Sequence, residues 1–111
     1  MYEWIKDFDV AITVCDKNGI ITEMNAKSCN TFASHGGAAL IGTSLYDCHK
    51  PSSQDKIREL LATGKANAYT IEKNGQKKLI YQQAWYQDGE IAGLVEMSLV
   101  LPEQMPHYVR S

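Results

Sequence analysis

The sequence has few cysteines: three in 111 residues, at the widely spaced positions 15, 29 and 48. An odd number of cysteines without a Cys-x-x-Cys pair fits neither a disulfide framework nor a structural zinc site. Free thiols in a reducing compartment are the simpler interpretation, so we expect a cytoplasmic protein.

The sequence also lacks a basic excess and long apolar runs. Eleven basic residues face thirteen acidic ones, so we expect no nucleic-acid partner. No apolar run approaches the roughly 18 residues of a membrane span, and the acidic start does not read as a secretory signal. With 44% hydrophobic and 22% charged residues and no repeat, the chain is typical of one globular domain.

Three turn signals divide the β-rich segments. They are Asn18-Gly19, Asn74-Gly75 and Asp88-Gly89, and each is typical of a tight hairpin. The alternating or β-branched segments beside them predict strands over residues 10–15, 20–24, 68–72, 78–87 and 91–101. We expect the last three strands to form an antiparallel meander.

Helices are predicted before and between these strands. Residues 2–8 form a short amphipathic pattern, and Asn25 is a candidate N-cap for a helix to about residue 33. A short helix is predicted over 45–49, ended by Pro51. The next begins with capping-box-like spacing of Ser52 and Asp55 and stops at Gly64. Helices in blocks between strands predict an α+β fold: a five-stranded antiparallel sheet with helices packed on one face.

Three motifs in this order resemble a PAS domain. The hairpin Ala11–Asn25 resembles the PAS opening, Leu40–Leu45 resembles the "iG.s" segment, and Asp88–Gly93 resembles the turn before the final strand. Asp47-Cys48-His49-Lys50-Pro51 is similar to a Cys-His-x-Pro variant of bacterial sensory PAS domains. The resemblance covers roughly residues 8 to 101, so we expect a PAS domain over 9–101, preceded by the amphipathic helix over 1–8 and followed by a tail over 102–111.

The usual Asp-Ile-Thr after the last strand is replaced by Val100-Leu101-Pro102. That motif commonly leads toward an output domain, but only about ten residues follow here. We therefore expect either an excised domain or a stand-alone module that acts on a signalling partner in trans.

The resemblance implies a small cavity between sheet and helices. Alignment with the family places one group of strand residues toward the helices, although a register error of one residue would invert the assignment. Segments around the long helix complete the candidate small-molecule site. The strand group is Tyr81, Gln83, Trp85, Glu96 and Ser98, and the other candidates are Tyr46, His49, Ile57 and Leu60. The alternative is a filled core without a ligand.

Two cofactors are weighed against the motifs. Leu45 stands where flavin-bonding PAS domains carry a cysteine, so we do not expect a flavin photoadduct. Haem is the more specific cofactor hypothesis, because imidazole is a common iron ligand and His49 precedes the long helix. Cys48 is a second candidate ligand. The opposing interpretation is that His49 caps a helix end or hydrogen-bonds the turn at Ser52 and Ser53. We expect His35 and His107 to be exposed.

Enzymatic chemistry is not expected. Cys48 and His49 are neighbours, and adjacent side chains in a helix do not face one another. No G-x-S-x-G, phosphate loop or paired-carboxylate pattern is present. Redox sensing by Cys48 stays open.

The sequence therefore predicts a sensory or interaction module in signal transduction, with a haem-based gas or redox sensor as the alternative. A ligand or partner would bias two packings of the sheet against the helix near residues 52–63. We also expect a homodimer through an apolar patch on the N-terminal helix and the outer sheet face. Its residues are Trp4, Ile5, Phe8, Met97 and Leu99.

Overall fold

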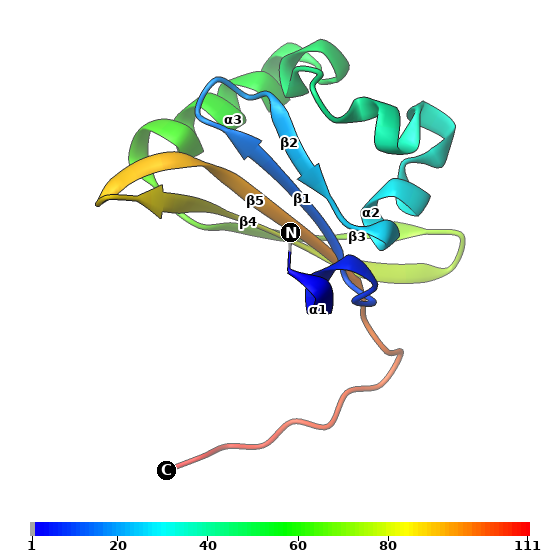
Figure 1. Ribbon diagram of the computed structural model, residues 1–111. Coiled ribbons are helices and arrows are strands. Elements are labelled where there is room, and N and C mark those ends of the chain that lie inside the picture. The colour runs from blue at the N-terminus through cyan, green and yellow to red at the C-terminus, as the bar shows by residue number, and fades with distance from the viewer. Residues whose placement is uncertain (1) are drawn as a thin grey trace.

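A computed structural model describes residues 2–111; for Cys48 it describes the backbone but not the side chain. A sheet is covered by helices that arch from one side of it to the other (Figure 1). The elements, with η for 3-10 helices, are α1 (Glu3–Lys6), β1 (Ala11–Asp16), β2 (Ile21–Met24), α2 (Ala26–Thr31), η1 (Ala33–His35), η2 (Gly37–Leu40), η3 (Leu45–Cys48), α3 (Pro51–Thr63), β3 (Asn67–Lys73), β4 (Gln76–Gln87) and β5 (Glu90–Val100).

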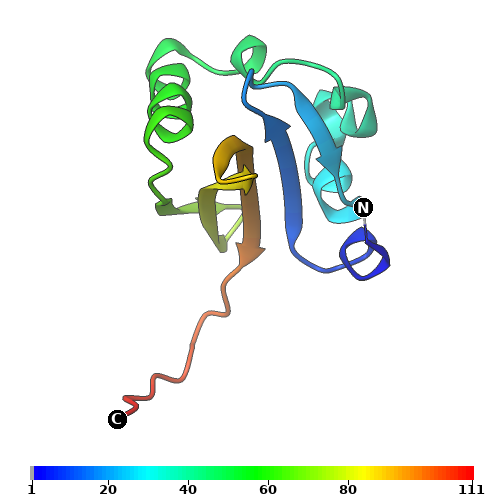
Figure 2. The same cartoon turned by 60° about the vertical axis from the view of Figure 1, so that its left-hand side comes forward.

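The five strands form one sheet in the order β2-β1-β5-β4-β3, and every neighbouring pair is antiparallel. The predicted α+β class and the final meander are therefore confirmed. Asn74 and Asp88 adopt positive φ angles of 53° and 52°, the left-handed conformation that their Xaa-Gly turns require. The helical segments connect β2 to β3 and pack on one face of the sheet. α2 packs against β1 and β2, and α3 packs against β4 and β5, so the two helices lie over opposite ends of the strand order (Figure 2).

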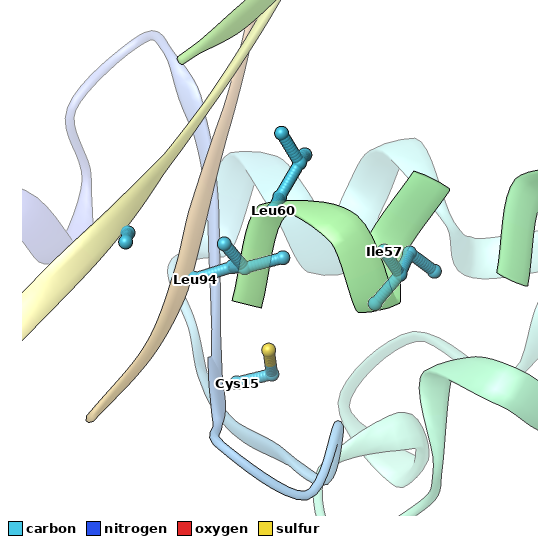
Figure 3. Close-up of a cluster of buried hydrophobic side chains, with 5 residues drawn as sticks. Cys15, Ile57, Leu60 and Leu94 are labelled. Carbon is cyan, nitrogen blue, oxygen red and sulfur yellow. The ribbon is translucent and has the colours of Figure 1, made fainter. Parts of the chain in front are cut away.

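The core lies between α3 and three strands. Ile57 and Leu60 of α3 pack with Cys15 of β1 and Leu94 of β5 (Figure 3), and Ala84 of β4 completes the cluster. Leu60 is 1% exposed. The apolar i and i+3 positions of α3 thus attach this helix to the sheet.

The start of α3 differs from the sequence prediction. Pro51 is its first residue and Lys50 its N-cap, with no side-chain cap, so the capping box at Ser52 is wrong. Proline suits the first helical position because its missing N–H has no helical partner there. Gln54 Nε2 instead donates to the carbonyls of Tyr46 and His49, which fixes the turn before the helix. Gly64 ends α3 at φ 73°, as predicted.

The N-terminal helix is shorter than expected. It spans Glu3–Lys6, has no buried residue, and leaves Phe8 outside the helix, in edge-to-face contact with Trp4. Asn25 is the N-cap of α2, as predicted, and accepts a hydrogen bond from the Ser28 N–H. None of the helices in residues 2–111 is long and apolar enough to cross a membrane.

Candidate functional site

An irregularity in the β4–β5 hairpin decides which side chains face the helices. Tyr86 pairs with Ile91, but Trp85 pairs with Gly93, so Ala92 is left as an extra residue. Such a bulge shifts all later pairs by one position and reverses the faces on one strand relative to the other.

The bulge places the predicted β4 residues on the opposite face of the sheet from the predicted β5 residues. Glu96 lies opposite Gln82, whereas Tyr81 lies opposite Met97. Because Ala84 and Leu94 belong to the core beneath α3, Gln82 and Glu96 face the helices. The prediction that Tyr81, Gln83 and Trp85 share this face is therefore wrong. The Tyr81 hydroxyl donates to Gln83 Oε1 at 3.0 Å on the opposite face.

Trp85 also lies on the face away from the helices. Its indole passes over Gly93, and the indole N–H donates to the Cys15 carbonyl oxygen at 3.0 Å. A Cβ at position 93 would lie 2.6 Å from the indole nitrogen and 1.8 Å from that oxygen. Only glycine fits here, because any side chain would enter backbone atoms of β1.

A row of four polar residues crosses the helix-facing side, one from each of four neighbouring strands. Asn67 Nδ2 donates to Gln82 Oε1 at 2.8 Å, and Gln82 Nε2 donates to Glu96 Oε1 at 2.7 Å. Thr13 lies opposite Glu96 on β1. All four are partly exposed. We call Thr13, Glu96, Gln82 and Asn67 the polar row.

Apolar and small residues flank the polar row on both sides along the strands. The flanking rows are buried and consist of Cys15, Leu94 and Ala84 toward α3, and Ala11, Ser98 and Ile80 away from it. A polar stripe at positions that face helices departs from the apolar pattern of a sheet core, and such departures mark functional sites.

Tyr69 lies beside the polar row, opposite Ile80, and is 44% exposed. Partial burial raises the pKa of its phenol, and the negative charge of Glu96 raises it further. Burial likewise raises the pKa of the Cys15 thiol, with smaller contributions from the charges of Asp16 and Glu96. The carboxylate of Glu96 therefore acts on groups on both sides of the polar row.

Hydrogen bonds connect the polar row to the N-terminal helix. The hydroxyls of Thr13 and Ser28 lie 2.5 Å apart. Asn25 Oδ1 accepts from the N–H of Ser28 at 3.0 Å and from the N–H of Ile12 at 2.9 Å. Asn25 Nδ2 faces carbonyls of α1 and of the segment that follows it, at 3.0 Å for Ile5, 3.4 Å for Phe8 and 2.8 Å for Val10. This side chain is 1% exposed.

The remaining predicted site residues occupy varied positions. Ile57 and Leu60 fill the core, and Tyr46 is half-buried against them beneath the Arg58 guanidinium at 4.8 Å. Ser98 is buried beside the polar row. The structure therefore brings Glu96 and Ser98 together but separates them from the outer-face residues.

His49 is exposed, and its Nδ1 lies 2.6 Å from the Leu45 carbonyl oxygen at the start of η3. This contact agrees with the alternative in which His49 bonds a helix end. Leu45 and Tyr46, which precede His49 in the chain, pack against the core cluster. The haem alternative stays a prediction. The Cys48 side chain lies outside the described residues. In the described part, no three His, Cys, Asp or Glu side chains form a metal-binding group.

Two open depressions lie elsewhere on the surface. One, of about 630 Å³, lies between the α1–β1 segment and α2, and includes Phe8, Lys27 and Cys29. The other, of about 300 Å³, lies at the β4–β5 turn and includes Trp85. The second includes the predicted residue Trp85, but neither includes Glu96 or His49.

Sequence comparison finds no match: neither a family model nor a curated protein matches the chain. Solved structures match at low identity. The Aer2 receptor of Vibrio cholerae, described as a dual PAS-heme oxygen sensor, aligns with a TM-score of 0.62 and 15% identity over 84% of this chain and 95% of that one. The PAS domain of the histidine kinase ThkA aligns with a TM-score of 0.66 and 16% identity over 80% and 96%. The chain has a PAS fold.

A further structural neighbour with this fold is a larger protein. VqmA of Vibrio cholerae, described as a dimer with a LuxR-type DNA-binding mechanism, aligns with a TM-score of 0.70 and 16% identity over 97% of this chain. The chain spans 55% of VqmA. At identities this low, the structural alignments establish the PAS fold alone, and the sequence motifs predicted this fold. The Cys-His-x-Pro variant stays a prediction.

Proposed function

We propose that this PAS domain is a non-enzymatic sensory module of cytoplasmic signal transduction. In this proposal, a small molecule or partner contacts the helix-facing side of the sheet, and the resulting shift reaches α1. The PAS neighbours support a general sensory role, since they include an oxygen sensor and a histidine kinase domain. The observation that carries the proposal is the hydrogen-bonded path from the polar row through Thr13, Ser28 and Asn25 to α1.

The path gives a mechanism for passing on occupancy. A ligand changes the balance of two packings only if it binds them unequally. A group bound to Glu96 would act on Thr13, its neighbour across the strands, and so on the contact with Ser28. Ser28 is fully buried and shares Asn25 Oδ1 with β1, so a shift there moves the amide that holds α1.

Thr13→Val tests this path because it removes the hydroxyl and keeps the shape. We expect faster hydrogen exchange in residues 2–9 and unchanged exchange in α3, measured by mass spectrometry. The matched control is Thr22→Val on β2, whose exposed hydroxyl donates to the Val14 carbonyl at 3.3 Å. Equal exchange in the two variants would show that no signal passes through Thr13.

A second experiment tests ligand sensing itself. The purified chain is examined by native mass spectrometry for a co-purified small molecule, and then by hydrogen exchange with and without it. We expect a bound species whose removal changes exchange in residues 2–9. A bound species that leaves this segment unchanged would contradict the sensory role.

We further propose that the outer sheet face and α1 pair with a second copy of the chain. Trp4 is 64% exposed and contacts Phe8, and Met97 is exposed on the outer face. Light scattering at tens of micromolar, a range suited to weak association, is expected to give a dimer that Met97→Lys dissociates. Met105→Lys, in the exposed tail, is the control. A monomeric wild-type chain would refute this interface.

A further inference from the structure

The polar row has a fixed direction of hydrogen bonding. An ionised carboxylate only accepts hydrogen bonds, so the contact with Glu96 must come from the amide nitrogen of Gln82. The oxygen of Gln82 is then the acceptor for Asn67 Nδ2. Glu96 thus sets the orientation of both amides. The acceptors Asn67 Oδ1 and Glu96 Oε2 stay available, and each amide nitrogen also keeps a second N–H.

The charge of Glu96 is not balanced by a neighbour. Within residues 2–111, no lysine or arginine forms an ion pair with it, although pairs such as Lys56–Glu59 and Lys27–Asp9 form elsewhere. Its hydrogen-bond partner is the neutral Gln82 amide. Glu96 is partly exposed between two buried rows, and a positively charged donor would form a stronger hydrogen bond with it than the neutral amide does.

An aromatic ring stands near this carboxylate. Tyr69 lies on the same side of the sheet, two residues along β3 from Asn67 and opposite Ile80, and is 44% exposed. A carboxylate and an aromatic ring on one side of the sheet are a favourable setting for a cation, because the ring face and the carboxylate both attract positive charge.

We propose that the polar row binds a small organic cation with N–H donors, and that Glu96 carries the charge recognition while Tyr69 contacts the flat part of the ligand. This inference rests on the proposed function, since it names the chemical class that the sensory site takes. Thr13, beside Glu96, places the bound cation at the start of the path to α1.

Benzamidine tests this class, because it is a flat cation with paired N–H donors. Its matched probes are neutral benzamide and anionic benzoate. Titrations of the ¹⁵N-labelled chain are followed by NMR. We expect benzamidine to shift the amide signals of the polar row and to bind about tenfold more tightly than benzamide, the ratio expected of one charge-assisted contact. Benzoate is expected not to shift them.

Glu96→Gln removes the charge and keeps the shape, and Glu90→Gln removes an exposed charge from the same strand. We expect about tenfold weaker benzamidine binding in the first variant and wild-type binding in the second.

Benzamide binding as tightly as benzamidine at the polar row would overturn the ligand class and leave the sensory site standing. Binding of benzamidine that Glu96→Gln does not weaken would overturn the role of Glu96. If no probe shifts the amide signals of the polar row, the proposed cation site is wrong. The proposed function is then tested separately by native mass spectrometry.

Discussion

Two helices of this PAS domain are attached in different ways. α3 is held by apolar side chains, with Ile57 and Leu60 buried against three strands. α1 has no buried residue, and the side-chain amide of Asn25 bonds backbone carbonyls within it and just after it. Apolar burial is non-directional and scales with area, whereas an amide contact is lost as soon as its geometry changes.

The difference separates a permanent attachment from a releasable one. Segments with few buried apolar contacts open at low free energy, while core segments open only on global unfolding. We therefore expect α1 to separate from the sheet while α3 stays in place. That is the behaviour that the proposed function requires of α1.

The largest expected effect comes from Leu60→Ala. Removing this fully buried side chain leaves a cavity beneath α3 and should lower the free energy of unfolding by about 2–5 kcal/mol. Urea denaturation measures the change. The adjacent Leu61 is only half-buried, so Leu61→Ala should cost clearly less. Similar values for the two variants would contradict the apolar attachment of α3.

Asn25→Asp is expected to have an intermediate effect. It keeps the oxygen that caps α2 and replaces the Nδ2 donor by an oxygen facing three carbonyls. We expect a loss of about 1–3 kcal/mol, with faster hydrogen exchange confined to residues 2–9. Asn30→Asp, at an exposed position of the same helix, is the control. Faster exchange throughout α2 would mean that the amide holds the whole fold rather than α1.

The smallest expected effect is a pH dependence of the core under α3. Because burial raises the pKa of Cys15, the folded thiol stays protonated where the unfolded thiol ionises. Its contribution to stability is present below the ordinary thiol pKa and is lost as pH rises through the folded pKa.

Comparing wild type with Cys15→Ala by urea denaturation across alkaline pH isolates this contribution. The wild type should lose up to about 1.4 kcal/mol per pH unit more than the variant. Identical slopes in wild type and Cys15→Ala would show that this thiol does not titrate differently on unfolding.

Local sequence signals predicted the elements of the fold well. The Xaa-Gly turns at Asn74 and Asp88 require positive φ, and the N-cap at Asn25 needs only its own helix. These features depend on neighbours in sequence, so they could be read before the structure was known. The remainder of Asn25's contacts, with carbonyls 15 to 20 residues away, depend on the tertiary structure.

The candidate site was predicted only in part, because it depends on the register of β4 against β5. Without the extra residue Ala92, Tyr81 would lie opposite Glu96, as the sequence interpretation assumed. Gly93 was the available signal, since a glycine inside a strand often marks a bulge or a close backbone approach. Gln82 was missed for this reason. Asn67 and Tyr69 lie on β3, from which the sequence prediction placed no residue in the site.

The indole of Trp85 spans β5 to reach β1, and this has a practical consequence. The chain has two tryptophans, and the other, Trp4, lies in the amide-held helix. Trp85→Phe leaves emission from the N-terminal segment alone, and Trp4→Phe leaves emission from the junction of the two strands. The native sequence thus supplies one optical reporter for each half of the molecule, without an added dye.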